Sequence, residues 1–234
     1  MPTSPAAVII PAYNEEPGIA RVVADIPRDL VSEIIVVDNG STDRTATKAQ
    51  EAGARVVFQP DRGYGAACLA GIAALPPATE VVLFLDGDYS DDPAQAGDLL
   101  RALEEHRADL VLGSRTRGCP EPGSLTPQQR FGNWLSTAII RLIYGHAYTD
   151  LGPFRAIRRE ALSRLDMQDR TYGWTVEMQV KALQQGLKVV EIPVRYRPRL
   201  GRSKVSGTLS GTVKAGFKIL WTIARLSLRR PLRL

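Results

Sequence analysis

The sequence has little of what holds disulfide-rich or zinc-dependent proteins together. It contains two cysteines, Cys68 and Cys119, and two histidines in 234 residues. Two cysteines exclude a disulfide framework. His106 and His146 have no cysteine or histidine partner at the ligand spacing of a zinc site. The sequence also lacks the Gly-x-Ser-x-Gly turn and the Cys/His pair that supply nucleophiles in many hydrolases.

Long apolar runs and a secretion signal are also missing. The longest uncharged stretch, residues 63–79, is interrupted by Pro76 and Pro77, whereas a membrane-spanning helix needs about 20 mostly apolar residues. The first residues, Met-Pro-Thr-Ser-Pro, have neither the basic stretch nor the apolar core of a signal peptide. We therefore expect a cytoplasmic protein, a compartment that favours free thiols over a disulfide between the two cysteines.

Acidic residues are absent from the end of the chain. Residues 192–234 contain eleven Lys or Arg and no Asp or Glu, which leaves 19 basic and 25 acidic residues before them. Such a basic tail suits nucleic acid, an anionic membrane surface or phosphorylated substrates, and charge alone does not choose among them. The whole chain, with 44% hydrophobic and 24% charged residues, has the length and composition of one globular domain.

Short apolar runs alternate with amphipathic stretches along the sequence. The runs predict strands at residues 6–10, 33–37, 55–58, 80–85 and 109–113 and an edge strand at 188–196. The periodic stretches predict helices at residues 18–30, 42–52, 65–74, 93–106, 131–144 and 176–185 and a basic amphipathic helix at 212–228. The alternation predicts an α/β fold, a Rossmann-like and mostly parallel sheet with helices on both faces. Residues 115–129, rich in Gly, Pro and polar residues, are interpreted as a mobile loop.

Three polar loops follow predicted strands. They are residues 11–15 (PAYNE), 38–41 (DNGS) and 86–88 (DGD). In open parallel sheets, ligands bind at the carboxyl ends of the strands, so we expect these loops to meet in one crevice. Two carboxylates on a tight turn at this edge offer the hard oxygen ligands that Mg²⁺ or Mn²⁺ prefers. The pattern therefore predicts that Asp86 and Asp88 hold a metal ion bridging a diphosphate.

The loops carry a resemblance to a known family. Together with residues 38–43 (DNGSTD) and 63–66 (GYGA), they resemble the nucleotide-sugar half of family 2 glycosyltransferases. The resemblance implies the GT-A fold, an inverting displacement, and a nucleotide-diphosphate sugar as donor. It also implies that the donor is contacted by Pro11, Tyr13, Glu15, Asp38, Gly65, Asp86, Gly87 and Asp88.

The second half of the chain resembles a narrower group, the polyprenyl-phosphate (dolichyl-phosphate) sugar synthases. The motifs are residues 113–115 (GSR), 150–155 (DLGPFR), 172–177 (YGWTVE) and 201–204 (GRSK). The resemblance implies a lipid phosphate acceptor, clamped by Arg115 and Arg130 because an arginine fork bonds two phosphate oxygens. It also implies a third metal position at Ser90, where the group often has Gln.

Residues 201–204 form a basic Gly-rich loop. The resemblance implies that Arg202 and Lys204 close over the donor diphosphate; the alternative is an exposed basic turn.

The need for a general base depends on the acceptor. A phosphate acceptor is already an anion at neutral pH, so catalysis would rest on positioning and on the metal at Asp88. A hydroxyl acceptor on a soluble or cell-wall molecule would require Asp150 or Glu177 to remove a proton. For Glu177 an equally weighted alternative is a structural partnership with Arg155 or Arg158.

The basic helix predicted at residues 212–228 joins an apolar face to Lys and Arg side chains. It is typical of a helix that lies in a membrane interface, the alternative being a helix packed on the catalytic domain. The helix at 131–144 is a second candidate for lipid contact. We expect a catalytic domain at 1–200, divided into a nucleotide-sugar half (1–113) and an acceptor half (114–200), and a membrane-surface tail at 201–234.

The resulting prediction is sugar transfer to polyprenyl phosphate by a peripheral protein at the inner, cytoplasmic face of the membrane. Nucleic acid is not expected as a partner. A nucleotidyltransferase would share the sheet but should have an early Gly-rich loop with Arg and Lys, where this chain has Tyr13-Asn14-Glu15. A basic binding module without catalysis would explain the tail but not the three strand-end loops.

Overall fold

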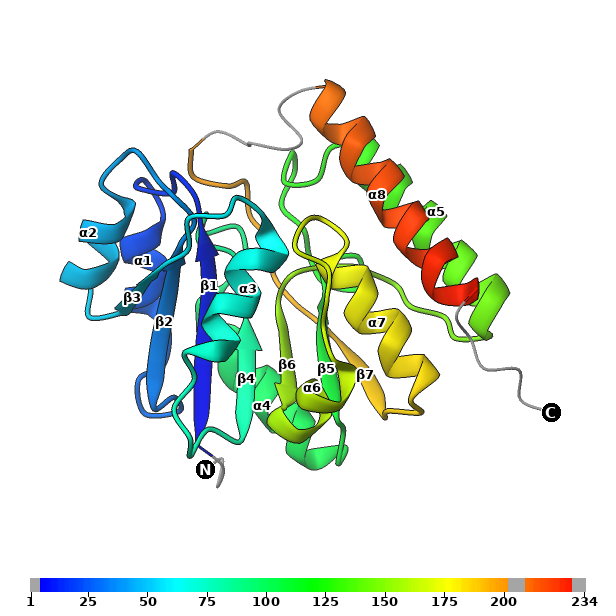
Figure 1. The fold of residues 1–234 in the computed structure, drawn as a ribbon, viewed down its shortest axis with the longest axis horizontal. Helices are drawn as coiled ribbons and strands as arrows, with labels where there is room; N and C mark the ends of the chain where they lie inside the picture. Colours follow the sequence, from blue (N-terminus) through cyan, green and yellow to red (C-terminus); the bar gives the residue numbers. More distant parts are fainter. Residues whose placement is uncertain (1–4, 202–208, 229–234) are drawn as a thin grey trace.

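A twisted, mostly parallel sheet forms the centre of the molecule (Figure 1). The computed structural model describes residues 5–201 and 209–228. In this part of the chain the sheet has seven strands in the order β3-β2-β1-β4-β6-β5-β7. The strands are β1 (Ala6–Ala12), β2 (Glu33–Asp38), β3 (Arg55–Phe58), β4 (Val81–Phe84), β5 (Leu110–Ser114), β6 (Arg155–Arg158) and β7 (Val189–Pro193).

Helices cover both faces of this sheet, as the sequence pattern predicts. They are α1 (Ile19–Asp25), α2 (Thr45–Glu51), α3 (Tyr64–Ala73), α4 (Ala96–Glu105) after a short 3-10 helix η1 (Pro93–Gln95), α5 (Pro127–Tyr144), α6 (Arg159–Leu165), α7 (Trp174–Gln184) and α8 (Leu209–Leu228). Two apolar cores lie on the two faces of the sheet, and successive residues of β1 point alternately into one and the other. Ala7 and Ile9 pack with α3 and α7, whereas Val8 and Ile10 pack with α1 and α4. A strand buried on both faces needs a continuous apolar run, and β1 has one.

One strand and one helix were missed by the sequence prediction. Strand β6 lies between β4 and β5 and is antiparallel to both, and α6 follows it directly. The four residues of β6, Arg-Ala-Ile-Arg, are too short for a readable period and carry a charge at each end. Arg155 is nevertheless fully buried. Its guanidinium donates hydrogen bonds to the carbonyl oxygens of Gly152 and Thr175, which lets a charged residue occupy the core.

Several boundaries differ from the sequence prediction for local reasons. Helix α1 stops at Asp25 because Ile26, which precedes Pro27, is extended. Helix α2 starts later than predicted, and Ser41 does not cap it; the Ser41 hydroxyl instead accepts a bond from the Asn14 amide. Helix α5 starts earlier than predicted. Thr126 caps its first turn, which begins at Pro127, and forms a reciprocal capping box with Gln129.

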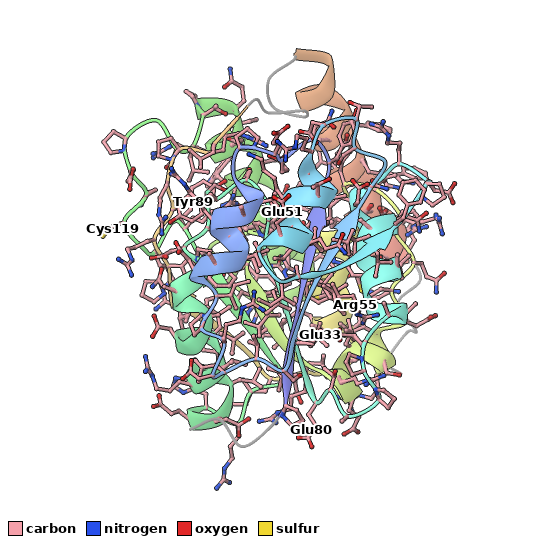
Figure 2. The ribbon with its side chains drawn as sticks, turned by 90° about the vertical axis from the view of Figure 1, so that its left-hand side faces the viewer. Glu33, Glu51, Arg55, Glu80, Tyr89 and Cys119 are labelled. Carbon is pink, nitrogen blue, oxygen red and sulfur yellow. The ribbon has the colours of Figure 1, made fainter. Side chains whose placement is uncertain are left out.

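The two cysteines are free. Cys68 is buried in α3, and Cys119 lies at the outer edge of the molecule (Figure 2). At the edge of the sheet formed by β3, Arg55 lies beside Glu33 of β2 (Figure 2), and the two form an ion pair of 2.5 Å.

Helix α8 packs along α5 and on α7 (Figure 1). Ile223 and Leu226 are buried in the core cluster that contains α7. The packed-helix alternative therefore holds for one face of α8. Among the described helices none is long and apolar enough to cross a membrane.

The second half of the chain is fastened to the first half at the start of α3. The amides of Gly65 and Ala66 donate to the carbonyl oxygens of Thr171 and Arg170. A Cβ on Gly65 would lie 1.9 Å from the carbonyl oxygen of Asp169. Only glycine allows this approach of two backbones.

We predict that Gly65→Ala lowers the free energy of unfolding by about 3 kcal/mol, because backbone atoms must separate to admit the methyl group. The measurement is urea unfolding followed by circular dichroism. The matched control is Gly132→Ala in α5, where a Cβ meets nothing within 4 Å; it should change stability by less than about 1 kcal/mol. Equal effects of the two substitutions would contradict the close packing at Gly65.

Candidate functional site

A cavity of about 1170 Å³ opens at the carboxyl ends of β1 and β4. Its floor comes from the loops that follow these strands, with Pro11, Tyr13, Glu15, Asp86, Gly87 and Asp88 among the lining residues. One wall is the start of α3, and the opposite wall consists of α5 and α8. All three predicted strand-end loops therefore contribute to the lining, and the loop after β2 does so through Asn39 rather than Asp38.

The turn after β4 concentrates negative charge. Asp88 is buried, and its Oδ1 accepts bonds from the Ser90 amide (2.9 Å) and hydroxyl (2.6 Å). Asp86 keeps some exposure, but its Oδ1 is buried without a hydrogen-bond partner. Burial, followed by the charges of Asp88 and Asp91, raises the pKa of the Asp86 carboxyl well above its usual value. The turn is thus short of positive charge.

Asp91 belongs to the same cluster and was not singled out from the sequence. It is 1% exposed, and neither of its carboxylate oxygens has a partner of ordinary hydrogen-bond geometry. Burial raises its pKa to about 7, against the effect of Arg115 and with a further contribution from Asp88. The available signal was the acidic run after β4, with four Asp among residues 86–92.

These carboxylates fit a divalent cation in their chemistry. A buried carboxylate oxygen without a donor is costly, and a hard cation is the partner that relieves it. Among residues 5–201 and 209–228, however, no three His, Cys, Asp or Glu form a ready-made metal cage. Mg²⁺ and its relatives commonly take one or two carboxylates and complete their shell with substrate phosphates and water. Asp86 and Asp88 suit that arrangement, while Ser90 is engaged by Asp88.

Three arginines from residues 195–199 face the acidic turn. Arg195 and Arg197 pair with Asp92 at 2.8 and 2.6 Å. Arg199 Nη2 lies 2.7 Å from Glu15 Oε1, and its Nη1 lies 3.3 Å from Asp88 Oδ2. Arg199 was not predicted from the sequence. Arg202 and Lys204, which were expected to close over the donor diphosphate, lie outside the described residues.

Arg115 lines the cavity and is held rigidly. Its guanidinium forms a two-pronged pair with Asp150 (2.7 and 2.8 Å), and the Arg115 amide donates to the same carboxylate. It also lies over the Tyr196 ring at 5.0 Å. Asp150 is 1% exposed and does not line the cavity. The geometry therefore makes Asp150 the support of Arg115 and gives no backing to its predicted role as a base.

Glu177 and Arg130 also lie outside the cavity lining. Glu177 is fully buried and accepts bonds from the amides of Gln168 and Asp169 and from Lys181 Nζ at 2.9 Å. The structural alternative for Glu177 fits this geometry, although its partners are not the arginines we expected. Arg130 is exposed on α5.

The remaining predicted donor residues surround the start of α3. The Arg62 guanidinium stacks over the Tyr13 ring at 3.7 Å. The Asn39 side chain bonds the backbone of Gln59, Asp61 and Gly63 and thereby shapes this wall. Asp38 accepts the Ser41 amide at 3.0 Å and lies behind the wall. Gly65 does not line the cavity but fixes this wall to the loop before α7.

The wall formed by α5 and α8 carries apolar side chains on the cavity side, among polar residues of α5 such as Gln129 and Asn133, and it also carries exposed aromatic side chains. Leu135, Ile219 and Leu220 line the cavity. Outside the lining, Trp134, Phe217 and Trp221 are 62%, 69% and 55% exposed, and Phe131, which lines the cavity, is 60% exposed. An ion pair of 2.9 Å between Lys218 and the buried Asp169 anchors α8 to the loop before α7. We call the four exposed aromatic side chains the aromatic face.

Comparison with known proteins agrees with this geometry. The sequence matches the family Glycosyl transferase family 2 over residues 7–166. An uncharacterised glycosyltransferase of Mycobacterium tuberculosis is 41% identical over 212 residues, which cover 89% of this chain and 93% of that protein. A dolichyl-phosphate hexose transferase of Haloferax volcanii is 33% identical over 232 residues, covering 97% of this chain and 96% of that protein.

A solved structure shares the architecture. Glucosyl-3-phosphoglycerate synthase from Mycobacterium tuberculosis, in complex with Mn²⁺ and UDP-glucose, is 26% identical with a TM-score of 0.76, over 96% of this chain and 79% of that chain. This likeness confirms the expected GT-A fold. The chain belongs to glycosyl transferase family 2, as its motifs predict.

Proposed function

We propose that this protein transfers a sugar from a nucleotide-diphosphate donor to a polyprenyl phosphate, with inversion at the anomeric carbon. One observation carries the proposal. A single cavity is lined by the negatively charged turn of Asp86 and Asp88, by Arg115, and by apolar side chains of α5 and α8. The turn suits a metal-bound diphosphate, Arg115 suits an acceptor phosphate, and the apolar wall suits a lipid chain.

The donor side uses the residues at the strand ends. Asp86 and Asp88 would hold Mg²⁺ or Mn²⁺. When bound, such an ion neutralises charge that develops on the departing nucleoside diphosphate. Tyr13 and Arg62 would bind the nucleoside part, since stacked planar groups offer a face to a base. The solved relative bound to Mn²⁺ and UDP-glucose supports this assignment.

The acceptor side needs no general base. A lipid phosphate is an anion at neutral pH and attacks the anomeric carbon directly from the face opposite the leaving group. This fits the engagement of Asp150 and Glu177 in structural bonds. Arg115 would position the phosphate, because its fork is fixed by Asp150 before the acceptor arrives. The relative named dolichyl-phosphate hexose transferase supports a lipid phosphate acceptor.

The aromatic face would bring the cavity to the acceptor. Aromatic side chains prefer the interface of a bilayer, and basic residues beside them are drawn to anionic lipids. Arg130 and Arg141 are exposed on α5 next to this face. We therefore propose peripheral binding at the cytoplasmic surface of the membrane, with residues 201–234 as the attaching segment and 1–200 as the catalytic part.

The deciding experiment is a transfer assay. The protein is incubated with UDP- or GDP-sugars, Mg²⁺ or Mn²⁺, and either a short polyprenyl phosphate or 3-phosphoglycerate as a soluble acceptor. We expect a glycosylated lipid phosphate in the mass spectrum, and its loss with EDTA or with Asp88→Ala. Transfer to the soluble acceptor alone would contradict the lipid proposal and favour a family member with a hydroxyl acceptor.

Asp86→Asn should raise the stability of the protein and remove its response to a divalent metal ion. Without added metal we expect the variant to be more stable by about 1–2 kcal/mol, because burial and the charges of Asp88 and Asp91 penalise the ionised Asp86 carboxyl. Addition of Mn²⁺ should raise the melting temperature of the native protein but not that of the variant. Asp98→Asn, at an exposed pair with Arg101, is the control and should change neither value. A destabilised Asp86→Asn that still responds to Mn²⁺ would refute the assignment.

Removal of indole rings should weaken membrane binding. We expect the double variant Trp134→Ser and Trp221→Ser to bind anionic phosphatidylglycerol vesicles on the order of tenfold more weakly in a sedimentation assay. Phe58→Ser is the matched control, because Phe58 is 66% exposed on β3, away from the cavity. If the control loses as much binding as the double variant, the aromatic face is not the docking surface.

A further inference from the structure

Arg199 joins two strand-end loops that are far apart in the sequence. Its guanidinium contacts Glu15, which follows β1, and Asp88, which follows β4. Glu15 and Asp88 line the floor of the cavity, and Arg199 lies with them. The guanidinium therefore places a positive charge beside Asp88, where a divalent cation would also place one.

The backbone fixes this position. The Leu200 amide donates to the Asp88 carbonyl oxygen at 2.8 Å, and the Arg197 amide donates to the Ser90 carbonyl oxygen at 2.8 Å. Arg195 and Arg197 add ion pairs to Asp92. Residues 195–200 are thus attached along the acidic turn at several points, and the placement of Arg199 does not depend on its side chain alone.

The bonding of Arg199 is incomplete. Its Nε is buried without a hydrogen-bond partner, and its contact with Asp88 is long at 3.3 Å. A guanidinium has five N–H donors and bonds phosphate oxygens well. Arg199 therefore has donors to offer to a second anion that enters the cavity.

We propose that Arg199 is a placeholder cation that couples metal binding to donor binding. Without donor it neutralises Asp88 and Glu15 and thereby competes with the divalent ion for Asp88. When the ion arrives with a nucleoside diphosphate, Asp88 would bind the ion. The Arg199 guanidinium would then be free to donate hydrogen bonds to the diphosphate. The inference rests on the proposed donor and adds a positioning role for Arg199 together with a thermodynamic consequence.

The consequence is a pair of effects with opposite signs. Removing the Arg199 charge should strengthen binding of the ion alone, because its competitor is gone. The same change should weaken binding of the nucleoside diphosphate, because a donor to its phosphates is gone. The bound ion raises the affinity for the nucleotide by the same factor by which the bound nucleotide raises the affinity for the ion. This coupling factor should be smaller in the variant. A residue that merely supports the fold would weaken both ligands together.

The test compares Arg199→Met with the native protein and with Arg195→Met. The control removes the same charge from the same segment at a side chain that is 66% exposed and outside the cavity lining. Electron paramagnetic resonance of free Mn²⁺ measures binding of the ion alone. Titration calorimetry with UDP and with GDP at saturating Mn²⁺ measures nucleotide binding. Circular dichroism verifies folding, and Arg199→Gln replaces the methionine variant if that one does not fold.

For Arg199→Met we expect Mn²⁺ alone to bind about tenfold more tightly, the order of effect of one nearby unit charge. We expect UDP or GDP to bind about tenfold more weakly, and Arg195→Met to leave both affinities within about twofold. Unchanged or weaker binding of Mn²⁺ alone by Arg199→Met overturns the proposal. Failure of UDP and GDP to bind the native protein would contradict the proposed donor, whereas the measurement with Mn²⁺ alone would still judge the placeholder role.

Discussion

The excess of negative charge where β4 ends is the constraint around which the site is built. Asp86, Asp88 and Asp91 lie within a span of six residues after β4, and burial penalises the ionised forms of Asp86 and Asp91. A fold that needed only stability would have apolar residues there. The surrounding chain compensates this charge only in part, since Asp86 Oδ1 and both carboxylate oxygens of Asp91 are buried without a hydrogen-bond partner.

The second half of the chain supplies the arginines that lie near this charge. Residues 195–199 bring arginines along the turn, and Arg115 lies close enough to influence Asp91. Asp150 in turn holds Arg115 through an ion pair. The same cavity is lined by apolar side chains of α5 and α8, among them Leu135, Ile219 and Leu220. Carboxylates, an arginine and apolar side chains in one cavity suit the two substrates that we propose, a nucleotide-diphosphate sugar and a lipid phosphate.

Local signals in the sequence predicted the part of the site that lies in consecutive residues. An apolar run followed by Asp-Gly-Asp indicates both the strand and its functional end, and a capping box or a proline accounts for the helix limits that differed. Strand β6 escaped because four residues with terminal arginines carry no period. Arg199 escaped because its meaning depends on Glu15, which is 184 positions away. Asp150 and Glu177 were predicted as alternatives for a base, and only their hydrogen bonds reveal the structural work they do.

The most direct test of the account is a crystal structure of the protein grown with Mn²⁺ and UDP or GDP, in which anomalous scattering locates the ion. The account predicts one Mn²⁺ within bonding distance of the Asp86 or Asp88 carboxylate. It also predicts the diphosphate between that ion and the wall that carries Arg115. An ion bound elsewhere, or a nucleotide held away from the ends of β1 and β4, would contradict the claim that this charged edge is the catalytic centre.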